Sequence, residues 1–302
     1  MRFTVETWAP DYGTPIDPDM DESATAVDVA VELPPGEWEP IDSHAEAAAE
    51  VVFVDGVRRV DANVWIEATA EIPPVHGVCA SYAAGAVRCT DVAEICSVLV
   101  ERSLFTPAPG AEEIDTAHGR YGVEPTVGST AEELWLGIQR RMGILEGRVA
   151  AGLRSEGMVV VDGPLSHHQQ VPGAVGYVKT QLVHHLPEDL RWILRRIPVG
   201  RRTPIFLMGG ARQVFSWYLR LATAGSVMSG IVRCEVGASG PVAAAIHTAD
   251  RVTATLPRFA SQEHKDPRAP QNLYPIGGLE RELRHRLGDP AIMERALRRA
   301  AS

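Results

Sequence analysis

The sequence lacks a long apolar run. None of its 302 residues lie in a stretch that approaches the roughly 20 consecutive apolar residues needed to cross a bilayer. The first residues, Met1 to Glu6, also lack the basic segment and apolar core of a secretory signal. We therefore expect a cytoplasmic protein with no membrane association.

Cysteine is scarce as well. The chain has four cysteines, and no two of them have the two-residue spacing of a zinc knuckle. Reduced and mostly buried thiols are the ordinary state of such cysteines inside a cell. The sequence therefore gives no reason to expect a zinc site. The four are Cys79, Cys89, Cys96 and Cys234.

Basic residues are almost absent from the first 50 positions. This stretch holds thirteen of the 39 acidic residues but one of the 29 basic residues, which predicts an acidic N-terminal arm over residues 1–50. Within it, Pro10 to Ser23 is typical of a loop or a loosely ordered segment. The arm is either a solubilising tail, or a segment that docks on a basic partner or folds over the active site.

The rest of the chain carries slightly more basic than acidic residues. Arginines gather within residues 191–202 and again within residues 281–299. Such clusters are compatible with a polyanionic ligand, although solvated helix faces have the same composition.

Two short apolar runs each end in Asp-Gly. Residues 51–54 lead into Asp55-Gly56, and residues 158–161 lead into Asp162-Gly163. Each run has the β-branched composition of a buried strand, so each aspartate is expected at the rim of a sheet. The glycine allows a sharp turn and the close approach of a substrate. Asp-Gly is also a common turn dipeptide, but two copies in this setting favour a shared divalent-metal site.

The order of elements predicts the fold class. Three strands come first, then a helix that opens with a capping signal at Thr130 and Glu133, then a returning strand. This order predicts an α/β fold with a ribonuclease H-like mixed sheet, flanking helices and a C-terminal helical extension, over residues 51–302. The expected strands are 51–55, 58–70, 75–89, 158–162, 203–208, 231–236 and 242–250. Residues 93–102 are expected to be helical or partly strand, and helices are expected at 131–155, 188–195, 214–222, 279–287 and 290–300.

Phosphodiester hydrolysis by two divalent metals about 4 Å apart needs several carboxylates, because Mn²⁺ and Mg²⁺ prefer hard oxygen ligands. We expect Glu146 to join Asp55 and Asp162, since it directly follows Leu145 in the apolar stripe of the long helix. A solvent-facing charge is an equally good interpretation of Glu146. The alternative third acids are Glu67, Glu132 and Glu133.

Other residues could assist the reaction. Lys179 follows an apolar run, where an ammonium group can contact a phosphate. The stretch 256–276 is rich in proline and polar groups, which is typical of a ligand-facing loop. In it, His264 or Tyr274 could orient water or the leaving oxygen. His285 lies among arginines on a predicted helix, where a surface role is favoured.

These motifs, in this order, resemble the NurA nucleases over roughly residues 50–290. The matching stretches are Val54-Asp55-Gly56, Glu146, residues 161–166, residues 176–180 and residues 273–276. The resemblance implies a ribonuclease H-like, Mn²⁺- or Mg²⁺-dependent DNA nuclease with 5′-to-3′ exonuclease and single-strand endonuclease activity. It also implies a homodimer that docks on a hexameric HerA-type ATPase. By position, Asp55, Glu146 and Asp162 would be metal ligands, and Tyr274 would match a late tyrosine of the family.

The sequence departs from that family at three places. Val57 follows the first Asp-Gly where the family has serine or threonine, Pro164 replaces a small polar residue, and the late histidine has no clean match in His264 or His285. An alternative function is therefore a catalytically inactive adaptor that binds DNA or the ATPase ring. An Argonaute-like domain shares the expected topology, but 302 residues leave little room for a guide-binding module.

Overall fold

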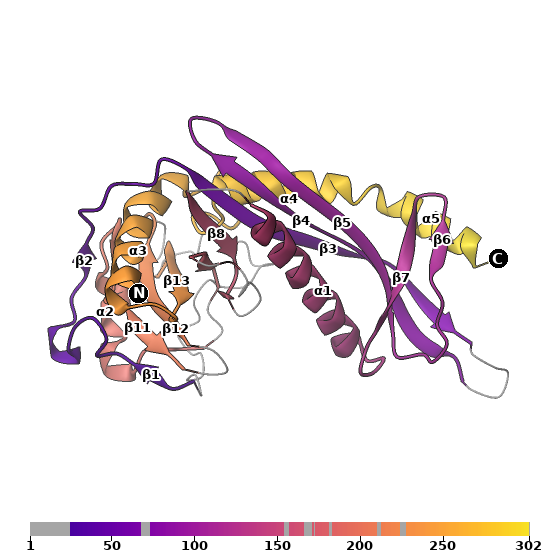
Figure 1. The fold of residues 1–302 in the computed structure, drawn as a ribbon, viewed down its shortest axis with the longest axis horizontal. Helices are drawn as coiled ribbons and strands as arrows, with labels where there is room; N and C mark the ends of the chain where they lie inside the picture. The colour runs from indigo at the N-terminus through magenta and orange to yellow at the C-terminus, as the bar shows by residue number, and fades with distance from the viewer. Residues whose placement is uncertain are drawn as a thin grey trace, which may run out of the picture. The chain divides into compact units, whose positions relative to one another are not determined.

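A computed structural model describes residues 25–67, 73–153, 157–165, 171, 173–180, 183–209, 213–223 and 228–301. The protein is a mixed α/β protein with a large mixed sheet and C-terminal helices (Figure 1). The chain forms two compact units. The first comprises residues 1–53, 88–94 and 154–277, and the second comprises residues 54–87, 95–153 and 278–302.

The first unit contains most of the short strands. In the order in which they pair, its strands run β1-β11-β12-β13-β9-β8, and β3 follows β8. The central pair, β12 and β13, is antiparallel, whereas β8 and β9 are parallel. The strands are β1 (Val27–Asp28), β2 (Ile41–Asp42), β8 (Met158–Asp162), β9 (Val175–Val178), β10 (Arg201–Arg202), β11 (Phe206–Met208), β12 (Val214–Arg220) and β13 (Ile231–Gly237), and the helices are α2 (Trp192–Arg196) and α3 (Val242–Thr255).

The second unit is built on long strands, which Figure 1 shows as neighbours in the order β3-β4-β5-β7-β6. Strand β3 begins in the first unit and continues into the second, because the division between units falls after Phe53. Helix α5 packs on β6, and its Met293 and Leu297 join a core with Cys79, Leu104 and Tyr121. The elements are β3 (Val51–Ile66), β4 (Val75–Cys89), β5 (Ala93–Thr106), β6 (Ile114–Thr116), β7 (Gly119–Pro125), α1 (Ala131–Gly152), α4 (Tyr274–Arg286) and α5 (Pro290–Ala300).

Several predicted elements are confirmed. The long helix α1 begins after Thr130 with a complete capping box, in which the Thr130 hydroxyl accepts from the Glu133 amide and the Glu133 carboxylate accepts from the Thr130 amide. Strand β8 and helix α5 have the predicted bounds. Among the described residues, no helix is both long and apolar enough to cross a membrane.

Other predictions are wrong. Residues 51–66 form one strand, so Asp55-Gly56 does not end β3; Gly56 adopts an extended conformation that continues the ladder. Of the two alternatives for residues 93–102, the helix is wrong and the strand is confirmed, because residues 93–106 form the strand β5. The aromatic segment 214–220 is strand β12 rather than a helix, because its β-branched and aromatic residues favour a strand. Conversely, the alanine-rich segment 242–255 is helix α3 rather than a strand.

The described part of the predicted acidic arm, residues 25–50, packs within the first unit. Strand β1 pairs with β11, and the Trp38 side chain lies in a core with Phe206 and Tyr218. Glu32 accepts two hydrogen bonds from the buried Arg202 guanidinium, each at 2.8 Å. The predicted loop from Pro10 to Ser23 lies outside the described residues.

A buried aspartate organises the second unit. Asp61 on β3 accepts hydrogen bonds from Ser81 on β4, from the Tyr121 hydroxyl at 2.9 Å and from Arg59 Nε at 2.8 Å. Burial, and then the Asp61 charge, raises the pKa of Tyr121, so the phenol stays protonated and donates. Arg59 also donates to the Leu287 and Gly288 carbonyls just after α4. Asp61 therefore links three strands to the end of a helix.

We predict that Asp61→Ala destabilises the protein by about 3 kcal/mol or more, because it leaves buried donors without their acceptor. The measurement is the midpoint of urea unfolding. The matched control is Asp115→Ala, which removes an exposed ion pair with Arg120 and should leave the midpoint unchanged. Equal midpoints for the two variants would contradict the role given to Asp61.

Candidate metal centre

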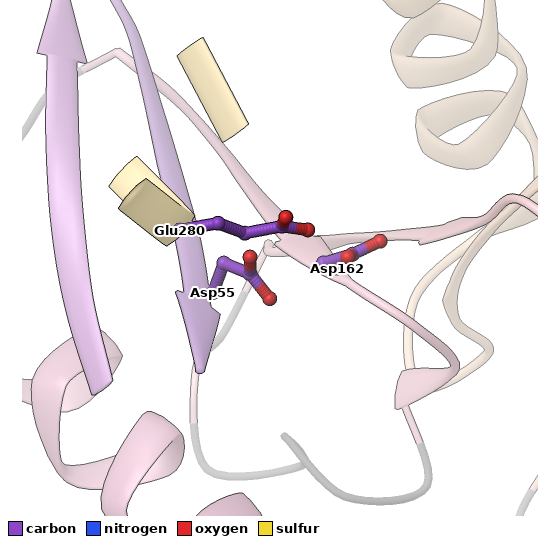
Figure 2. Close-up of side chains that lie close together, drawn as sticks. All are labelled: Asp55, Asp162 and Glu280. Atoms are coloured by element: carbon purple, nitrogen blue, oxygen red, sulfur yellow. The ribbon is translucent and has the colours of Figure 1, made fainter. Parts of the chain in front are cut away.

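Three carboxylates from three separate elements lie close together. They are Asp55 on β3, Asp162 at the end of β8 and Glu280 on α4 (Figure 2). One carboxylate oxygen of each lies within 4.8 Å of those of the other two. Asp55 is buried and Asp162 is partly buried. Such a group of hard oxygen ligands is suited to a divalent cation.

The first Asp-Gly makes room for another acid. A methyl group at Gly56 would overlap the carboxylate of Glu146 on α1 and would lie 3.0 Å from Met142 Cγ. Glu146 is itself 5% exposed. Gly56 is therefore needed for a close approach, as the sequence predicted, but in the structure the approaching group is a glutamate side chain.

The second Asp-Gly makes the turn that the sequence predicted. Gly163 has φ of +95°, a conformation that favours glycine, and its amide donates to the Tyr177 carbonyl at 2.8 Å. The Asp162 side chain is held at the end of β8, next to β9. The strand end and the glycine together fix the place of this carboxylate.

A lysine neutralises the second aspartate. Lys179 Nζ lies 2.6 Å from Asp162 Oδ2, with the two side chains 11% and 15% exposed. The same ammonium donates to Asn272 Oδ1 at 2.9 Å, and Asn272 in turn donates to Asp266 Oδ2 at 2.7 Å. Lys179 therefore joins the end of β8 to the proline-rich segment before α4. A charge-assisted contact of this kind is stronger than a neutral hydrogen bond.

The remaining predicted residues occupy different surroundings. Tyr274 begins α4 and is 39% exposed, with the Lys265 ammonium 5.4 Å from its ring centroid. His264 and His285 are both exposed. Among the alternative third acids, Glu133 belongs to the capping box of α1, and Glu67 and Glu132 are exposed. The structure thus brings Asp55 and Asp162 together with Glu280, and places Lys179 on Asp162.

Sequence reasoning missed Glu280. The signal was present, because Glu280 directly follows Leu279 in the apolar stripe formed with Leu283 and Leu287, as Glu146 follows Leu145 in its own. Two glycines, Gly277 and Gly278, precede it in the first turn of α4. The sequence pattern that favours Glu146 as the third acid therefore favours Glu280 equally.

Comparison with known proteins adds no assignment. The chain matches no known protein family and no curated protein sequence.

We predict that Gly56→Ala lowers stability by about 1–3 kcal/mol, because the new methyl group displaces the buried Glu146 carboxylate. Adding Glu146→Ala should recover much of that loss, which a double-mutant cycle of unfolding free energies measures.

The control is Gly147→Ala, next to Glu146 on the same helix. A methyl group there meets no atom within 4 Å, so we expect it to stabilise α1 slightly. Additive effects of Gly56→Ala and Glu146→Ala would show that the two sites are not coupled.

Proposed function

We propose that this protein is a divalent-cation-dependent DNA nuclease, as its resemblance to the NurA nucleases implies. The observation that carries the proposal is the convergence of Asp55, Asp162 and Glu280. Two of these three residues are the metal ligands expected from the Asp-Gly motifs. The third, Glu280, comes from a helix, which is the kind of element expected to supply the third acid.

The donor set fits Mn²⁺ or Mg²⁺. Ligands on opposite sides of an ion lie about 4 Å apart for Mg²⁺ and about 5 Å apart for an ion of the size of Ca²⁺. The carboxylate oxygens lie within 4.8 Å of one another, which is compatible with one cation shared between them. All the ligands are carboxylates, which Mn²⁺ and Mg²⁺ accept more readily than softer metals do.

The bound cation would supply a nucleophilic water and would stabilise the charge that develops on the phosphate. The protein's own groups would do the rest. Asp55, Asp162 and Glu280 would fix the geometry, and Lys179 would pair with Asp162 while presenting a positive charge toward a neighbouring phosphate oxygen. Glu146, packed at Gly56, would add a fourth carboxylate next to Asp55.

The strand order supports the ribonuclease H-like part of the proposal. Strands β3 to β5 are followed by the short strands β6 and β7, by α1 and then by β8, which is the neighbour of β3 in the order β5-β4-β3-β8-β9. The predicted fold requires this return of the chain to the first strand of the three. This order makes β3 and β8 neighbours, which supports a cation site formed by the acidic residues that they carry.

Charge supports a polyanionic substrate. Exposed arginines on the two C-terminal helices include Arg281, Arg284 and Arg295, whereas Arg286 and Arg298 each pair with a glutamate four residues earlier. We further propose, from the resemblance, that the protein acts as a homodimer with a HerA-type hexameric ATPase in DNA-end processing, in recombination repair or in phage defence.

We predict Mn²⁺-dependent degradation of linear DNA that is lost in Asp55→Asn and in Asp162→Asn, because each change removes a charged ligand. The measurement is the release of labelled nucleotides, with EDTA as the metal-free reference. Asp115→Asn, an exposed carboxylate change, should retain activity. Full activity in both site variants would rule out the proposal, and cation binding without cleavage by the unaltered protein would favour the inactive adaptor.

We also predict that Glu280→Gln weakens Mn²⁺ binding by roughly tenfold or more, since it removes a ligand charge from the group. Titration calorimetry gives the affinity directly. Glu146→Gln is the matched comparison, and we expect a smaller effect because Glu146 lies at Gly56. A larger effect for Glu146→Gln would make Glu146 the third ligand, as the family resemblance implies.

A further inference from the structure

An arginine on β3 lies over an exposed indole on α1. The Arg58 guanidinium carbon is 4.3 Å from the centroid of the Trp135 ring, and Arg58 Nη1 is 3.5 Å from the Met142 sulfur. Trp135 is 44% exposed. The arginine therefore lies over the indole of a tryptophan that remains exposed to solvent.

The position of Arg58 is costly for a purely structural residue. Its Nε is buried and finds no acceptor among the described residues, and the sulfur that contacts Nη1 is a weak acceptor. Burial lowers the pKa of Arg58 more than the charges of Glu146 and Asp55 raise it. The guanidinium nevertheless stays protonated, so an incompletely solvated cation lies beside the indole.

Arg58 lies close to one member of the candidate metal centre, because the charges of Asp55 and of Glu146 both act on its guanidinium. Arg58 is three residues from Asp55 along β3, a distance of roughly 10 Å. On α1, Trp135, Met142 and Glu146 recur at spacings of seven and four residues, so they lie along one face of the helix. That face extends for about 16 Å from the indole to the glutamate at Gly56.

We propose that Arg58 and Trp135 form a binding site for a single strand of nucleic acid beside the metal centre. One unstacked base lies on the indole, and the guanidinium binds a neighbouring phosphate. Stacking on an aromatic ring needs a base that is not already stacked and paired in a duplex, so this site selects single-stranded DNA. The inference rests on the proposed nuclease function, and it adds the residues that position the strand.

The test is the binding of a fluorescently labelled thymidine dodecamer to the full-length protein in EDTA, followed by anisotropy. Trp135→Ala should weaken binding by about tenfold or more, and Trp135→Phe should retain most of the affinity. A dodecamer of abasic residues should bind the unaltered protein and Trp135→Ala equally, because it has no bases to stack. Arg58→Ala should weaken both probes and reduce the salt dependence of binding by about one phosphate contact.

The matched control is Trp192→Ala on α2. Trp192 is 40% exposed and carries its own arginine, Arg196, at 5.2 Å, but it lies on no element that bears a metal-site carboxylate. We expect its affinity for the dodecamer to equal that of the unaltered protein. Equal losses in Trp192→Ala and Trp135→Ala would overturn the inference, as would an unchanged affinity in Trp135→Ala or preferential binding of duplex DNA through Trp135.

Because these measurements are made without metal, they are independent of cleavage. Loss of strand binding in Trp135→Ala together with full nuclease activity in Asp55→Asn would refute the proposed catalytic centre and retain the strand site. Normal strand binding in Trp135→Ala together with an inactive Asp55→Asn would refute the strand site and retain the proposed catalytic centre.

Discussion

The mutual repulsion of carboxylates is the constraint on which the candidate centre depends. Two unit charges about 5 Å apart repel each other by about 3 kcal/mol at the effective dielectric constant of a protein surface. Asp55, Asp162 and Glu280 form three such pairs, and Lys179 compensates one member. Holding three acids so close together costs free energy in the folded protein unless a cation binds to them. The elements that carry the three acids therefore hold them together against their mutual repulsion, which is typical of a functional site.

The elements predicted correctly from the sequence are those that a short local motif specifies. The capping box at Thr130 and Glu133 fixes the start of α1, and the β-branched run before Asp162 fixes β8. The errors fall where propensity and periodicity conflict. Gly56 is a turn residue by statistics, yet an extended glycine costs little when the neighbouring strand supplies the ladder, so β3 continues for ten further residues.

The candidate site was predictable to a similar extent. Asp162 follows from the chemistry of a strand end, and Lys179 follows from its place after β9. Asp55 was predicted from the apolar run before it, although β3 continues beyond it. The third acid is different, because which helix supplies it depends on packing over distances that one sequence does not encode locally. Glu146 and Glu280 have the same sequence signal, but in the structure Glu146 packs at Gly56 whereas Glu280 lies with Asp55 and Asp162.

Strand β3 carries Asp55, Arg58 and Asp61 within seven consecutive residues. Side chains along a strand alternate between the two faces, so inserting or deleting one residue ahead of them would send all three to the wrong side at once. The candidate ligand Asp55, the arginine over the indole and the buried acceptor Asp61 therefore all depend on the same register of β3. Evolution can change these side chains one at a time, but it cannot change the length of this segment by one residue and keep any of them.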